Sequence, residues 1–160
     1  METAKDLFEH ELRDLYDAEH KLVLALESMA SKCSDQQLVD GFKTHKKMTE
    51  QQIARLEKVF ELVDRKPRRE PCAGITGLTE EFSKFVSDES PSPEVLDVFA
   101  ASAAKKVEQY EIQAYSSMVD LATKLGLSEA ADLLKATLSE EEKTYSEVSA
   151  AAEKVGKALS

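Results

Sequence analysis

An ionisable side chain interrupts the apolar face of the first predicted helix. In "LRDLYDAEHKLVLAL", residues 12–26, leucines repeat at the three- and four-residue steps of one helical face, and one of those steps lands on Glu19. A carboxylate costs free energy to bury unless a cation or hydrogen-bond donors compensate it. Glu19 is therefore a candidate for paired, protonated or metal-bound chemistry.

The other three long helical segments carry interruptions of the same kind near their midpoints. These are His45 in the second, Glu108 or Glu111 in the third, and Glu141 in the fourth. Because midpoints of antiparallel helices of similar length lie at the same height in a bundle, we expect these side chains and Glu19 to share one layer. The pattern predicts a polar layer inside an otherwise apolar core.

The chemistry of that layer depends on what neutralises it. Carboxylates crowded in an apolar interior must be protonated, salt-bridged or metal-bound, and two divalent cations would supply the missing charge. Carboxylate oxygens with one imidazole suit iron, manganese or zinc. The alternative stays open, since a single such residue is commonly a half-exposed acid or a hydrogen-bonded core histidine, and ionisable clusters also occur as purely structural networks.

Helical periodicity covers nearly the whole chain. Helices are expected at about 4–32, 36–64, 94–125 and 128–157, with a short helix at about 77–87 in the long connection between the second and third. Ser92 and Pro93 suit a helix start, and Gly126 suits a helix end. Short loops make each flanking pair an antiparallel hairpin. The sequence thus predicts an all-α, ferritin-like four-helix bundle with one long crossover, formed by residues 1–160 as a single domain.

The composition of the chain narrows the range of possible functions. The 160 residues include 31 acidic and 21 basic side chains, for a net charge of -10, which opposes general binding to nucleic acid or anionic membranes. We find no apolar run of the roughly 20 residues that a membrane span needs, and the N-terminus lacks a signal-peptide pattern. With Cys33 and Cys72 as the two cysteines, reduced thiols and a cytoplasmic location are expected.

Several segments of the chain resemble a known family. "DLFEHELRDLYDAEHKLVLAL", "HKKMTEQQIARLEKVFELV", "PCAGITGL", "AAKKVEQYEIQAYSSMVDLATKLG" and "AADLLKATLSEEEK" look like the YciF-like family of bacterial ferritin-like proteins, a domain of unknown function. The resemblance spans nearly the whole chain in the family's order. It implies a ferritin-like bundle, a homodimer, induction under general or osmotic stress, and a di-iron site with no established reaction.

The resemblance also implies which residues hold metal. The matching positions are Glu19 in "YDAEH", His45 in "KTHKKM", Glu108 and Glu111 in "VEQYE", and Glu141 in "LSEEE". In that reading Glu111 or Glu108 bridges, and Glu19, Glu141 and His45 are terminal ligands.

Two positions depart from the family pattern. Met48 stands where a glutamate follows the histidine, and Tyr145, on the same predicted stripe as Glu141, stands where an acid is common. Each change removes an oxygen donor, so the five ligands are left to hold one ion, or two ions completed by water.

Two functional hypotheses follow. In the first, the chain is a metal-binding stress protein whose core iron reacts with oxygen or peroxide, its substrate being unknown. In the second, it is a non-catalytic dimeric bundle whose metal site has degenerated, and Met48 and Tyr145 favour that reading.

Overall fold

The computed structural model describes residues 1–157 and 159, and within that part of the chain the regular secondary structure is entirely α-helical. The all-α prediction is confirmed. The helices are α1 (Ala4–Lys32), α2 (Gln36–Leu62), α3 (Ala73–Glu89), α4 (Pro93–Lys124) and α5 (Ser128–Lys157). The four long helices begin and end within two residues of the predicted limits.

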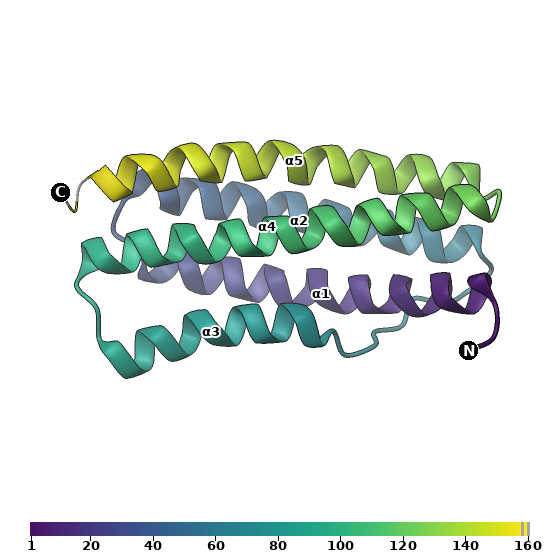
Figure 1. Cartoon of the computed structure of the whole chain (residues 1–160), viewed down its shortest axis with the longest axis horizontal. Coiled ribbons are helices and arrows are strands. Elements are labelled where there is room, and N and C mark those ends of the chain that lie inside the picture. The colour runs from purple at the N-terminus through teal and green to yellow at the C-terminus, as the bar shows by residue number, and fades with distance from the viewer. Residues whose placement is uncertain (158, 160) are drawn as a thin grey trace.

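The four long helices lie side by side, as Figure 1 shows. Helix α1 packs against α2, and α4 packs against α5, each pair joined by a short turn at one end. Contacts between α2 and α5 and between α1 and α4 bring the two pairs together. Helix α3 lies outside, along α1 and α4. This arrangement places the midpoints of all four long helices beside one another.

Local sequence signals set the helix ends. Thr3 and Asp6 form a capping box at the start of α1, in which each side chain accepts a hydrogen bond from the other's backbone N–H. Ser92 caps α4 through Val95 N, and Pro93 occupies the first turn, as predicted. Gly126 follows α4 with φ of 73°, a left-handed conformation that favours glycine.

The predicted short helix at 77–87 is too short. Helix α3 has 17 residues and begins at Ala73, with Cys72 as its N-terminal flanking residue. The prediction left residues 73–76, including Gly74, outside this helix. Gly74 instead lies inside the helix, and the Tyr110 ring packs so closely against it that a Cβ there would come 2.4 Å from Tyr110 Cε2. Close packing, rather than a turn, accounts for this glycine.

The apolar core has two parts. One contains Phe8, Leu12 and Leu15 of α1, and the other contains Leu22 and Leu26 of the same helix. The buried residues of α2 divide in the same way, with buried polar side chains between the two apolar groups. A polar layer therefore crosses the bundle at mid-height.

Among the described residues, none of the helices is both long and apolar enough to span a bilayer.

Candidate metal centre

Four of the five predicted ligands meet in the polar layer. His45 comes from α2, Glu108 and Glu111 come from α4, and Glu141 comes from α5. Each offers one ligand atom, and these four atoms all lie within 4.8 Å of one another. All four side chains are buried, with His45 the most exposed at 4%. Three helices thus bring one imidazole and three carboxylates to a single point.

The imidazole of His45 lies between two of the carboxylates. Its Nδ1 is 3.2 Å from Glu108 Oε1, and its Nε2 is 3.7 Å from Glu141 Oε2. Neither contact is a hydrogen bond, because both oxygens of Glu108, Glu141 Oε2 and His45 Nε2 have no hydrogen-bond partner. The Nε2 atom therefore remains available to another partner.

The fifth predicted ligand, Glu19, lies beside this group but is not one of its four members. It is fully buried on α1, and its Oε1 accepts a hydrogen bond from the Tyr115 hydroxyl. Its charge interacts with those of Glu111 and Glu141. The structure therefore brings four of the predicted residues together and places Glu19 at their edge.

Most of the acceptor atoms in the layer have no protein donor. Within residues 1–157 and 159, the buried side-chain atoms of this layer that lack a hydrogen-bond partner are both oxygens of Glu108, both oxygens of Glu111, Glu19 Oε2, Glu141 Oε2, Gln52 Oε1 and His45 Nε2. Buried polar atoms are nearly always paired in folded proteins. Carboxylate oxygens with one imidazole nitrogen are the ligands of iron, manganese and zinc sites. The residues present therefore fit a divalent transition metal.

The pKa shifts of the buried glutamates also indicate that the layer needs a compensating positive charge. Burial, followed by the charge of the Glu141 carboxylate, raises the pKa of Glu19 to about 8. Burial and the neighbouring carboxylates also hold the pKa values of Glu108 and Glu111 well above their usual range. Without a cation, burial favours the protonated forms of these side chains, and a bound cation would displace their protons.

A supporting network joins the layer to the surface. The Gln52 amide donates to Glu141 Oε1 and also, over 3.0 Å, to Glu140 Oε2. Arg55 holds Glu140 with two hydrogen bonds of 2.8 Å. Glu141 is thereby fixed by protein on one oxygen and left open on the other.

Sequence reasoning missed Tyr115 as a residue of the site. It follows Glu111 by four residues and Glu108 by seven, which places it on the same face of α4. Ala114, three residues after Glu111, fits the same helical spacing, but Ala114 is half-buried whereas Tyr115 is fully buried. The spacing from the two glutamates would have found it.

The placement of Tyr145 on the inward stripe of α5 is wrong. Tyr145 is half-buried, and its hydroxyl pairs with Gln109 Nε2 over 3.2 Å. The buried position is Thr144, whose Oγ1 lies 3.8 Å from Met48 Sδ. The apolar pattern did not identify Thr144 as the buried position, because a polar threonine was not counted as a core residue. Met48 and Thr144 therefore face each other next to the cluster.

These features define an all-helical protein with a buried glutamate and histidine cluster at the middle of the helices. Residues 3–159 match the family described as Domain of unknown function (DUF892), and the chain belongs to that family. The predicted resemblance is confirmed.

Among relatives, protein YciF of Escherichia coli K12 is 39% identical over 145 residues, which cover 90% of this chain and 87% of that protein. The crystal structure of the E. coli stress protein YciF matches with a TM-score of 0.93 and 37% identity, covering 98% of this chain and 99% of the other. YcfI from Rhodopseudomonas palustris matches with a TM-score of 0.90 and 32% identity, covering 92% and 94%.

Proposed function

We propose that the chain is a ferritin-like stress-response protein that binds iron, or else manganese or zinc, in the core of a four-helix bundle. The observation that carries the proposal is the meeting of four ligand atoms from three helices within 4.8 Å, in a buried layer where most acceptors have no donor. The stress role is supported by the description of E. coli YciF as a stress protein. The long α2 to α4 connection, with α3 inside it, supports the ferritin-like topology.

Each ligand has a role that its surroundings support. Glu108 and Glu111 have both oxygens without protein donors, which suits a bridging carboxylate. Glu141, Glu19 and His45 each keep one free ligand atom, which suits terminal binding. When bound, iron would supply electrons to oxygen or peroxide.

The protein's own residues hold this arrangement and keep water out. Gln52 fixes one oxygen of Glu141, and Tyr115 fixes one oxygen of Glu19, so that the second oxygen of each points to the same layer. Apolar core on both sides of the layer excludes solvent and strengthens the attraction for a cation.

The number of metal ions that the site can hold depends on the side chains around Met48. Met48 offers a thioether, and the Thr144 hydroxyl already donates to Glu140 O over 2.9 Å. Neither group is a carboxylate, which is the ligand that a second hard metal ion would prefer. We therefore propose one tightly held ion, with a second held more weakly and completed by water.

Metal content measured on matched variants tests the proposal. Protein purified without chelator, and then Glu111→Gln and Glu142→Gln variants, are analysed by mass spectrometry and for oxygen uptake on ferrous addition. Glu142 is exposed one residue from Glu141 and serves as the control. We expect at least one iron, manganese or zinc ion per chain in wild type and control, and at least a tenfold loss of affinity in Glu111→Gln. Metal-free wild-type protein without saturable binding would refute the proposal.

A second function is supported by Met48 and Thr144, which place no carboxylate at one side of the cluster. In this alternative the chain is a non-catalytic structural bundle with a degenerated site. The description of R. palustris YcfI as a candidate structural protein supports it. It predicts no metal uptake and a stabilising effect of Glu19→Leu, because the substitution relieves repulsion among buried carboxylates.

We also propose that residues 1–160 form one domain, that the protein is a cytoplasmic homodimer, and that it binds neither nucleic acid nor membrane. The family match over residues 3–159 supports the single domain. Two free cysteines support a reducing compartment, and the net charge of -10 disfavours anionic partners. Sedimentation analysis at several concentrations tests the dimer.

A further inference from the structure

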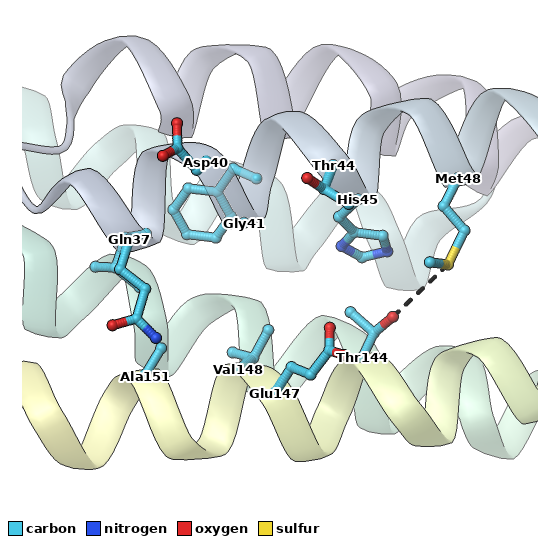
Figure 2. A pocket seen from close by; sticks show the side chains of 12 residues that line it. Gln37, Asp40, Gly41, Thr44, His45, Met48, Thr144, Glu147, Val148 and Ala151 are labelled. Carbon is cyan, nitrogen blue, oxygen red and sulfur yellow. Dashed lines mark hydrogen bonds between the residues drawn. The ribbon is translucent and has the colours of Figure 1, made fainter.

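A groove of about 330 Å³ lies between α2 and α5, and His45 is part of its wall (Figure 2). Its volume falls in the range of small-molecule sites, about 300–1,000 Å³. The buried side chains of Leu38 and Phe42 also line it, and α5 contributes Val148 and Ala151 from the opposite side. The groove is thus a mostly apolar recess that begins next to the candidate metal centre.

Contacts between the two helices close both ends of the groove. At one end the Thr144 hydroxyl meets Met48 Sδ at 3.8 Å, as the dashed line in Figure 2 marks. At the other end Lys154 Nζ donates to Gln37 Oε1 over 2.9 Å. The volume of about 330 Å³ is large enough for a ring system, since an apolar cavity of about 150 Å³ holds benzene.

The glycine on the α2 side keeps the groove open. Gly41 lines it near the start of α2, and a Cβ built there would have no atom within 4 Å. Glycine inside a helix costs stability relative to other residues. No neighbour requires its small size, so a larger side chain at 41 would extend into the space of the groove that Gly41 lines.

The chemistry of the lining selects the ligand. Met48 offers a polarizable sulfur, which favours contact with an aromatic ring. The Thr144 hydroxyl donates to Glu140 O, so its oxygen is left to accept a hydrogen bond from a ligand. Asp40 and Glu147 line the groove, and although Lys143 lies 3.7 Å from Glu147, that pair is exposed and weak. Acidic groups on a chain of net charge -10 repel anions.

We propose that this groove binds a small aromatic molecule that is neutral or cationic and bears a hydroxyl or amino group. The ring lies against Met48, and the hydrogen-bond donor points to Thr144. The inference does not depend on metal binding and is tested in its absence.

Two fluorescent probes that differ mainly by a sulfonate test the charge selectivity. N-phenyl-1-naphthylamine is a neutral aromatic amine, and 8-anilinonaphthalene-1-sulfonate is its anionic counterpart. In titrations of the metal-free full chain, we expect one molecule of the neutral probe to bind per chain and the sulfonate to bind about tenfold more weakly or less. The double variant Asp40→Asn, Glu147→Gln should reduce that difference. Equal binding of both probes would overturn the charge argument.

Matched glycine variants locate the site. Gly41→Leu fills the groove and should weaken binding of the neutral probe at least tenfold, with a melting temperature equal to or above that of wild type. Gly77→Leu is the control, because Gly77 lies in α3, is exposed and also has no atom within 4 Å of a built Cβ. Binding that survives Gly41→Leu would overturn the proposal. Failure of the wild-type chain to bind the probe would also overturn it. If Gly41→Leu then changed the oligomeric state, the groove would be covered by a second copy of the chain.

Discussion

Two kinds of buried carboxylate occur in this protein, and they differ in their donors. Asp17 accepts hydrogen bonds from Arg69 Nε at 2.8 Å and Cys72 N at 2.8 Å, and Lys21 Nζ lies 2.7 Å away. Asp97 accepts bonds from Ser34 and from the backbone of Asp35. The buried glutamates of the polar layer, by contrast, leave most of their oxygens without a donor.

The contrast separates structural acids from candidate ligands. Burial pushes the pKa of Asp17 upward, but Lys21, Cys72 N–H and Arg69 outweigh it, so the net pKa is lowered. The pKa values of Glu108 and Glu111 are raised, because nothing in the protein offsets their burial. The Asp17 carboxylate is compensated by the fold, whereas the glutamates proposed to bind a cation are left uncompensated.

The largest predicted effect is on the pH dependence of stability. In metal-free protein, the stability that comes from protonated Glu19 is complete below its unfolded pKa near 4.5 and is lost as the pH rises through about 8; the raised pKa values of Glu108 and Glu111 act in the same direction. The contribution of Asp17 has the opposite sign, since it is present above about pH 4 and lost below it. We expect the melting temperature to peak near pH 5 and to fall by about 5–10 °C by pH 8.

Calorimetry on chelator-treated protein across pH 3 to 9 measures this profile. Added metal should reverse the trend above pH 6, because ligand deprotonation strengthens metal binding. A melting temperature that rises steadily from pH 5 to pH 8 in metal-free protein would contradict the raised pKa values.

The next effect is the loss of the Asp17 anchor. Asp17→Asn removes the charge that holds Lys21, Arg69 and the Cys72 N–H, and should cost about 2–3 kcal/mol of unfolding free energy at pH 7. Urea unfolding measures it, with the exposed residue Asp120→Asn as the control. The cost should shrink at pH 3. An effect of Asp17→Asn no larger than that of Asp120→Asn would remove the distinction between the two kinds of acid.

Replacing a cluster acid should act in the opposite direction. Glu111→Met keeps the side chain's length and removes a charge that burial disfavours, so metal-free protein at pH 8 should gain about 1–2 kcal/mol. The same variant should lose the stabilisation that metal gives to wild type. Thermal melts with and without metal check both, and a destabilised metal-free variant would show that Glu111 is already satisfied.

The smallest predicted effect tests how tightly α3 packs against Tyr110 of α4. Gly74→Ala places a Cβ against the Tyr110 ring, whose hydroxyl lies 3.1 Å from Cys72 Sγ, and should cost about 1 kcal/mol or more. Gly77→Ala, in the same helix but unobstructed, should be neutral or stabilising. Similar melting temperatures for the two variants would mean that the α3 contact is loose.

Periodicity predicted the long helices well because each carries a regular apolar stripe and a clear cap, as at Ser92 and Gly126. It failed for α3, because the reason for Gly74 lies on another helix, in the Tyr110 ring. The hydrogen bonds of Asp17 could not be predicted either, since its partners Arg69 and Cys72 are more than 50 residues away and no local spacing joins them.

The site was predictable to the extent that its residues interrupt apolar stripes. Glu19, His45 and Glu141 could be predicted as buried polar residues because each replaces an expected core residue at mid-helix. Tyr115 and Thr144 were missed, because a tyrosine or threonine at a core position reads as packing or as surface. Their part depends on which hydrogen bonds they make, and only the folded arrangement determines that.

The most direct test of the metal-binding proposal is an anaerobic calorimetric titration of chelator-stripped protein with ferrous ions, in two buffers of different ionisation enthalpy. Metal binding at this site predicts saturable binding of one to two ions per chain and release of protons, because burial raises the pKa values of the glutamates and a bound cation displaces their protons. Absence of saturable binding, or binding without proton release, would contradict it.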